Sequence, residues 1–174
     1  MRLHLKDNES TETLGRTIAT AIQRTGMVRA IMFQGPLGSG KTTLIRALVE
    51  SLPGGELAEV SSPSFNVYNV YPTVPPTVHY DLYRLEGAGM DESYYEFLDE
   101  GRSLLLVEWA EFLPSGEWPD EWLLFRWVPC DEGRLVEIAA HGPEATCIRN
   151  ALTLPARPSG QRESDGKDNG NVPD

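Results

Sequence analysis

Residues 35–42 read GPLGSGKT and match the phosphate-binding pattern G-x-x-x-x-G-K-[ST] at every fixed position. Glycines in such a loop let the backbone curl until successive N–H groups point at phosphate oxygens. The helix expected after the loop adds the partial positive charge of its N-terminus. We therefore expect Lys41 to neutralise the β- and γ-phosphates of a nucleotide and the Thr42 hydroxyl to bind Mg²⁺.

The flanking residues supply the structure that this loop requires, a strand before it and a helix after it. Residues 28–34 are a short apolar run rich in strand-forming residues and predict a buried strand. A helix is expected over residues 41–52, ended by the Pro-Gly-Gly sequence at 53–55. The alternative, a flexible surface loop that contains glycine and lysine by chance, would not explain both flanks.

The rest of the chain alternates helical and strand patterns. Leu14, Ile18 and Ile22 are spaced by four residues and predict an amphipathic helix over residues 11–25, with Ser10 as its N-cap. Further along, the patterns predict strands at 64–71 and 77–83, a helix at 91–99, a strand at 104–107, and strands at 122–128 and 135–140.

Two of these strand pairs are joined by short turns and are expected to be antiparallel hairpins, at 64–83 and at 122–140. The earlier strand–helix units favour a parallel core. The expected fold class is therefore α/β. It is a three-layer fold of the phosphate-loop NTPase type, whose mixed sheet has a parallel core and added antiparallel strands.

Two carboxylates come directly after apolar strands. Glu108 follows residues 104–107, and Asp81 follows residues 78–80. Because the carboxyl ends of parallel strands meet at one edge of a sheet, both are expected near the phosphate loop. Either one is a candidate to hold Mg²⁺ or its water while the other orients an attacking water. The alternative is that both are solvent-facing residues at strand ends.

The loop at residues 61–64, Ser-Ser-Pro-Ser, lies between the helix after the phosphate loop and the first hairpin. Its hydroxyls are suited to sensing a γ-phosphate, as switch loops do. They are equally ordinary turn residues, and the pattern does not separate the two interpretations.

Composition sets further limits. The chain has 174 residues, with 15 Lys and Arg against 26 Asp and Glu, so its formal net charge is −11. This acidity argues against strong autonomous binding to RNA or DNA, because nucleic-acid-binding surfaces are basic. Six acids between Glu86 and Glu100 and five between Glu108 and Glu121 form either a solvated face or a docking surface for a basic partner.

Hydrophobic residues make up 40% of the chain, which excludes full disorder and suits one domain with a real core. We expect that domain over residues 1–154 and a disordered tail over 155–174, where Val172 is the only large aliphatic residue. Cys130 and Cys147 form no disulfide framework or zinc pattern and are expected to be small buried side chains. With no signal peptide and no membrane-spanning run, the protein is expected to be soluble and cytoplasmic.

Five segments together resemble the TsaE (YjeE) family, the ATPase component of bacterial tRNA threonylcarbamoyladenosine (t6A) synthesis. They are STETLG at 10–15, GPLGSGKTTL at 35–44, SSPSF at 61–65, HYDLYRL at 79–85 and LLVEWAE at 105–111. The string HYDLYRL followed by VEW is more specific than the phosphate loop alone.

The resemblance implies a role for each matching residue. Lys41, Asp81 and Glu108 would be catalytic, and Thr42 with Glu108 would hold Mg²⁺. Thr11 would lie near the adenine end of ATP, and Trp109 would pack beside the site, although a position in the core is the more common one for a tryptophan, which buries a large area. The residues that would wrap the nucleotide phosphates are Gly38, Ser39, Gly40, Lys41, Thr42 and Thr43.

The resemblance also implies a function. Such proteins bind ATP and hydrolyse it slowly when alone, and they associate with the TsaD–TsaB pair. TsaD transfers the threonylcarbamoyl group to adenosine 37 of tRNAs that read codons beginning with A, and the ATPase resets the complex for further turnovers.

Three other functions share a phosphate loop. A small-molecule kinase would need an acceptor pocket and an arginine-rich lid, whereas Arg84, Arg102, Arg126 and Arg134 are scattered along the sequence. A GTP-binding switch would carry the guanine-reading sequence Asn-Lys-x-Asp, which is absent from the chain. A nucleotide-sensing scaffold would use ATP binding alone to drive assembly.

Overall fold

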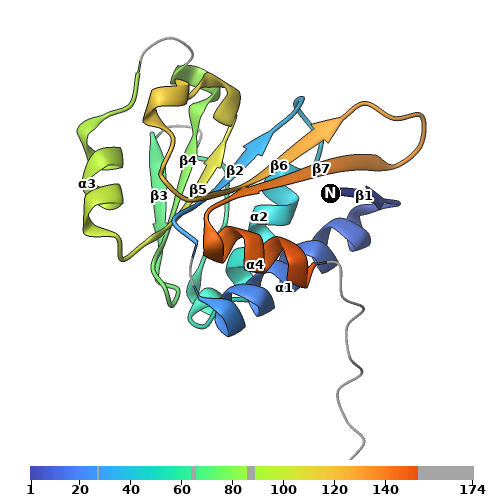
Figure 1. Cartoon of the computed structure of the whole chain (residues 1–174), viewed down its shortest axis with the longest axis horizontal. Helices are drawn as coiled ribbons and strands as arrows, with labels where there is room; N and C mark the ends of the chain where they lie inside the picture. Colours follow the sequence, from blue (N-terminus) through green and yellow to red (C-terminus); the bar gives the residue numbers. More distant parts are fainter. Residues whose placement is uncertain (27, 64–65, 86–88, 153–174) are drawn as a thin grey trace, which may run out of the picture.

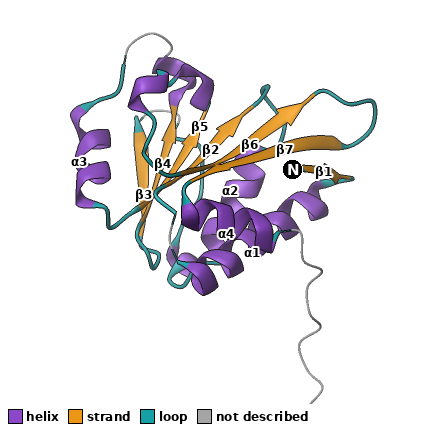
Figure 2. Cartoon of the chain, in the orientation of Figure 1, coloured by secondary structure: helices purple, strands orange, loops and turns teal. Residues whose placement is uncertain are grey.

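A computed structural model describes residues 1–26, 28–63, 66–85 and 89–152. Within these ranges one mixed sheet is flanked by helices on both faces, as Figures 1 and 2 show. The expected α/β class, with a parallel core and added antiparallel strands, is confirmed. The strands are β1 (Arg2–Leu5), β2 (Ala30–Gln34), β3 (Tyr68–Tyr71), β4 (Thr77–Asp81), β5 (Leu104–Glu108), β6 (Trp122–Val128) and β7 (Arg134–His141).

The order of strands across the sheet is β1-β7-β6-β2-β5-β4-β3. The four central strands β6, β2, β5 and β4 run parallel, and β3, β7 and β1 add antiparallel pairs at the two sides. The parallel strands therefore end at the same edge of the sheet. In the register, Glu108 at the end of β5 lies opposite Phe33 of β2 and Asp81 of β4.

The helices divide between the two faces of the sheet. Helices α1 (Asn8–Thr25), α2 (Lys41–Glu50) and α4 (Pro143–Ala151) cover one face, and α3 (Glu92–Glu100) lies on the other (Figure 2). Each face has its own apolar core, because the central strands are buried on both sides. Short 3₁₀ turns complete the fold: η1 (Gly55–Leu57), η2 (Leu82–Leu85), η3 (Ala110–Phe112) and η4 (Ser115–Glu117).

Helix α1 packs closely against α2, the helix that follows the phosphate loop. Gly15 makes this approach possible, since a Cβ atom added to it would lie 2.7 Å from the backbone oxygen of Leu44. Thr11 is one turn earlier on the same face of α1 and is fully buried. The close approach at Gly15 thus sets α1 against α2.

The structure corrects the predicted start of the first helix. Helix α1 begins at Asn8, and Asp7 is its N-cap, because the Asp7 carboxylate accepts a 2.7 Å hydrogen bond from the N–H of Ser10. Ser10, which we expected to be the cap, lies within the first turn. Both residue types cap helices well, so their order alone does not distinguish them.

The first hairpin is antiparallel as expected, but both of its strands are shorter. Strand β3 begins at Tyr68, and the predicted residues 64–65 lie outside the described residues. Strand β4 ends at Asp81 instead of residue 83, because the Asp81 carboxylate accepts a hydrogen bond from the N–H of Tyr83 and starts the 3₁₀ turn η2.

Two elements were not predicted, β1 and α4. Strand β1 has four residues, and it forms by pairing with β7 more than 130 positions later, as in the pair Arg2 and Glu137. Helix α4 buries only Ala145 and Ile148, too few apolar positions for a periodic signal.

The expected burial of the two cysteines is wrong, since Cys130 and Cys147 are both exposed free thiols. The tail predicted over residues 155–174 lies outside the described residues. Among the helices that the structure describes, none is long and apolar enough to cross a membrane.

Candidate functional site

The phosphate loop lies between β2 and α2, at the edge where the parallel strands end (Figure 1). Gly38 and Gly40 have φ angles of 74° and 103°, in the left-handed region where a side chain would be strained. Gly40 directly precedes α2, so the loop leads into that helix's free N–H groups. This arrangement suits binding of an anion such as a phosphate.

One buried polar atom of the loop independently points to a ligand. The Ser39 hydroxyl oxygen is buried and has no hydrogen-bond partner among the described residues. Buried polar groups are almost always hydrogen-bonded, so an unpartnered hydroxyl in this loop fits a site that is completed by a bound group.

Lys41 extends back across the loop. Its Nζ atom donates hydrogen bonds to the carbonyl oxygens of Gly35 (2.7 Å) and Pro36 (3.0 Å), and it lies 4.0 Å from the centre of the Trp109 ring. Burial lowers the pKa of Lys41, while the carboxylates of Glu108, Glu111 and Asp81 oppose that shift. The ammonium thus already lies over the loop that would hold phosphates.

Thr42 and Glu108 meet from opposite sides of the site. The Thr42 hydroxyl, in the first turn of α2, lies 2.9 Å from Oε1 and 3.1 Å from Oε2 of Glu108 at the end of β5. The Glu108 side chain is only 3% exposed. A hydroxyl and a carboxylate are hard oxygen ligands of the kind that Mg²⁺ prefers.

The donor set is incomplete without further oxygens. Within the described residues, no group of three or more His, Cys, Asp or Glu side chains is placed to hold a metal ion. Mg²⁺ in nucleotide sites is commonly bound by one or two protein groups together with substrate phosphates and waters. Thr42 and Glu108 therefore fit a cation that arrives with a phosphate ligand.

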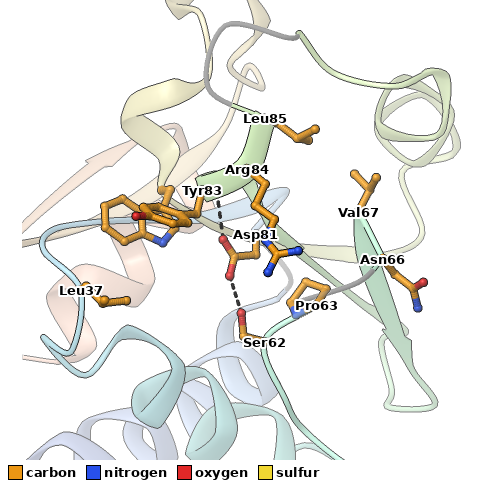
Figure 3. A pocket seen from close by; sticks show the side chains of 10 residues that line it. Leu37, Ser62, Pro63, Asn66, Val67, Asp81, Tyr83, Arg84 and Leu85 are labelled. Atoms are coloured by element: carbon orange, nitrogen blue, oxygen red, sulfur yellow. Dashed lines mark hydrogen bonds between the residues drawn. The ribbon is translucent and has the colours of Figure 1, made fainter.

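Asp81 lies beside this pair but makes different contacts. Its Oδ1 atom accepts a 3.0 Å hydrogen bond from the N–H of Tyr83, and its Oδ2 atom accepts one from the Ser62 hydroxyl (Figure 3). Neither of these two hydrogen bonds of Asp81 involves Thr42. Ser62 belongs to the 61–64 loop, so that loop touches the site, while Ser64 lies outside the described residues.

A pocket of about 300 Å³ opens next to the loop. Its walls include Asp81, Ser62 and Arg84, together with the exposed side chain of Leu37 (Figure 3). Trp109 also lines this pocket and packs against the edge of the core, so both interpretations of this residue hold in part. Its φ of 59° is unusual for a bulky residue and is of a kind often found at functional sites.

His79 lies directly beneath the site, although the sequence patterns assign it no role. Its side chain is fully buried, with Nε2 3.0 Å from Oε1 of Glu108 and Nδ1 3.4 Å from the hydroxyl of Tyr71. The Tyr71 hydroxyl in turn donates to the carbonyl oxygen of Ser61. The sequence feature that could have pointed to this role is a histidine within the otherwise apolar strand before Asp81.

Thr11 and Thr43 lie on the α1 side of the loop. Thr43 is half-buried in α2, in a cleft that it shares with Glu12 and Arg46. Thr11 is fully buried, and its hydroxyl donates to the carbonyl of Asp7 and accepts a hydrogen bond from Arg134. The structure therefore brings Thr11 near the loop, but with no surface of its own to offer a ligand.

The comparison with protein families decides the identity of the chain. The family model described as "Threonylcarbamoyl adenosine biosynthesis protein TsaE" matches residues 5–134, well over half of the sequence. The chain belongs to the TsaE family. The match extends from β1 to the first residue of β7 and so includes the loop, Asp81 and Glu108.

Curated TsaE proteins are similar over the same region. The chain is 43% identical to the tRNA threonylcarbamoyladenosine biosynthesis protein TsaE of Streptomyces coelicolor over 103 residues, which cover 56% of this chain and 66% of that protein. It is 37% identical to TsaE of Aquifex aeolicus over 62% of this chain and 74% of that protein. It is 34% identical to TsaE of Synechocystis over 66% of this chain and 73% of that protein.

The fold matches a solved structure. Bacillus subtilis YdiB superimposes with a TM-score of 0.62, covering 87% of this chain and 93% of YdiB at 23% identity. At this identity the likeness shows a shared fold, in agreement with the mixed sheet described above.

Proposed function

We propose that this TsaE-family protein is an ATPase that supports formation of t6A at position 37 of tRNAs reading codons that begin with A. The contact of Thr42 with the buried carboxylate of Glu108, directly beside the glycine loop, is the observation that supports the nucleotide site best. The names of the curated relatives support the pathway.

ATP would bind along the loop with Mg²⁺ between its phosphates and the Thr42–Glu108 pair. The cation would supply charge neutralisation and would fix the geometry of the terminal phosphates. The backbone N–H groups from Gly38 to Thr43 bind phosphate oxygens. Lys41 exchanges its two carbonyl partners in the loop for phosphate oxygens, which compensate its buried charge better than neutral carbonyls do.

The two carboxylates differ in their contacts, and this difference supports a division of roles. Glu108 contacts Thr42 and is assigned to the metal. Asp81 lies opposite Glu108 in the strand register and faces the pocket beside the loop, so we assign it to orienting the attacking water and holding its proton. The bond from the Ser62 hydroxyl keeps Asp81 in place and links it to the 61–64 loop.

The protein would act together with the TsaD–TsaB pair in the cytoplasm and be weakly active alone. TsaD would perform the transfer to tRNA, and ATP hydrolysis would reset the complex for the next turnover. The net charge of −11 supports a role that does not require this chain to grip tRNA itself.

Reconstitution tests this function. The mixture contains this chain, its TsaD and TsaB counterparts, tRNA, ATP, threonine, bicarbonate and the enzyme that makes threonylcarbamoyl-adenylate. Modification beyond one round per TsaD is expected only with this chain present. Equal multiple-turnover yield without it would contradict the proposal.

Two other functions of a phosphate-loop protein, a small-molecule kinase and a nucleotide-sensing scaffold, predict different experimental results. The pocket beside Asp81 is the observation that favours a small-molecule kinase, since it offers space for a phosphate acceptor. Release of inorganic phosphate with no phosphorylated product excludes that function. A nucleotide-sensing scaffold predicts that Glu108→Ala still binds ATP and still supports many rounds of t6A formation.

A further inference from the structure

The order of strands indicates where the two ends of a bound nucleotide lie. Glu108 and Asp81, which serve the terminal phosphate in the proposed function, come from β5 and β4 on one side of β2. The strands on the other side of β2 are β6 and β7. A nucleotide whose terminal phosphate lies at the carboxylates therefore extends its nucleoside toward β6 and β7.

Arg134 is placed at that end of the site. It is the first residue of β7, which runs antiparallel to β6, and its neighbour Leu135 pairs with Val128 at the end of β6. Arg134 thus lies at the same edge of the sheet as the phosphate loop. A Cβ atom added to Gly40 would lie 3.4 Å from Arg134 Nε, so the guanidinium packs directly against the loop backbone.

Helix α1 holds the guanidinium by two hydrogen bonds. Nη1 of Arg134 donates to the hydroxyl of Thr11 at 3.2 Å, and Nη2 donates to the side-chain oxygen of Asn8 at 2.7 Å. Two of its nitrogens are therefore occupied by protein partners, and the arginine is half-buried in a fixed orientation. What it can offer a ligand is the flat face of a rigid cation, which stacks well on aromatic rings.

We propose that Arg134 binds the nucleoside, with its guanidinium stacked on the base of the nucleotide that the loop holds. Thr11 and Asn8 are then positioning residues that act through Arg134, which gives the buried Thr11 a role without direct contact to the ligand. This inference rests on the proposed nucleotide-binding function and adds a residue to it.

The test compares a ligand with a nucleoside against one without. Titration calorimetry measures the affinities of the wild-type chain and Arg134→Ala for Mg·ATP and for Mg·tripolyphosphate. Stacking of a cation on an aromatic ring is favourable, and Arg134→Ala removes the cation that would stack. We therefore expect Arg134→Ala to bind ATP at least ~5-fold more weakly, with tripolyphosphate binding unchanged within about twofold.

Arg2→Ala is the matched control, because Arg2 is an arginine beside β7 that pairs with Glu137, away from the loop. It should alter neither affinity. Unchanged ATP affinity in Arg134→Ala, or an equal loss for ATP and tripolyphosphate, would overturn the assignment. If the wild-type chain binds neither ligand, the proposed nucleotide site itself has failed.

A second variant keeps the test decisive if Arg134→Ala loses its fold, which thermal unfolding without ligand would reveal. Arg134→Lys keeps the charge and removes the planar face. It should also weaken ATP binding and leave tripolyphosphate binding intact. Wild-type ATP affinity in Arg134→Lys would contradict stacking.

Discussion

Nε2 of His79 lies 3.0 Å from Oε1 of Glu108, and the two side chains are 0% and 3% exposed. Glu108 is therefore held on one side by the histidine and on the other by the hydroxyl of Thr42. A buried carboxylate between two hydrogen-bond partners has little freedom to rotate. His79 acts as a positioning residue for the carboxylate that we assign to Mg²⁺.

His79→Ala should raise the Mg²⁺ concentration needed for half-maximal ATPase activity by roughly tenfold to a hundredfold, the usual cost of losing a partner that orients a metal ligand. Nucleotide affinity without Mg²⁺ should change little, because the loop is intact. His79→Gln, which retains an N–H donor, should recover part of the loss. The same Mg²⁺ dependence in the wild type and His79→Ala would refute the positioning role.

Lys41→Ala should abolish both ATP binding and support of t6A formation. The ammonium donates to two loop carbonyls and Lys41 is only 4% exposed, so its charge lies where the nucleotide phosphates would bind. The thermal midpoint without ligand should not fall, because the variant removes a charge whose burial is unfavourable, as its lowered pKa indicates. Retained micromolar ATP binding would contradict the assignment of the loop.

Asp81→Asn should bind Mg·ATP within about threefold of the wild-type affinity, yet hydrolyse it at least ~100-fold more slowly, as for loss of a general base. The amide keeps an acceptor for the N–H of Tyr83, so the turn after β4 should persist. Ser62→Ala removes the hydroxyl that keeps Asp81 in place but leaves the carboxylate, so it should slow hydrolysis less than Asp81→Asn does. A normal turnover rate in Asp81→Asn would exclude its role in hydrolysis.

The residues that the sequence predicted are those with a local signal. The loop, β2 and the apolar strand before Glu108 are each continuous in sequence, so their positions at one edge follow from parallel pairing. His79 and Arg134 were not assigned, because their contacts depend on register. The partner of His79 is Glu108, which comes from the neighbouring strand. The partner of Arg134 is Thr11, which lies 123 positions away along the chain.

Gly15→Ala tests the approach of α1 to α2. Its added methyl would meet the backbone oxygen of Leu44 at 2.7 Å, and backbone does not move aside as a flexible side chain does. Overpacking of this kind costs about 1–3 kcal/mol, which should appear in the free energy of unfolding in urea. Gly116→Ala, where an added Cβ meets nothing within 4 Å, should be nearly neutral. Equal stability of the two variants would show that α1 has room to shift.

Tyr94 links stability to alkaline pH. Burial raises the pKa of its hydroxyl well above the ordinary value, with the negative charge of Glu117 adding to the effect, and the hydroxyl donates a 3.0 Å hydrogen bond to the Glu117 carbonyl. In the unfolded chain a tyrosine ionises near pH ~10. Above that pH the folded state keeps a proton that the unfolded state releases, so stability must fall as pH rises.

Tyr94→Phe should therefore have two opposite effects in denaturant unfolding. At pH 8 the variant should be less stable by about 1 kcal/mol, because the Glu117 carbonyl loses its donor. Between about pH 10 and 11.5 its stability should fall less steeply than that of the wild type, since one of the groups that releases a proton on unfolding is gone. Tyr80, whose pKa is also raised by burial, accounts for part of the slope that remains. Parallel curves for the two proteins over that range would mean that Tyr94 titrates alike in the folded and unfolded states.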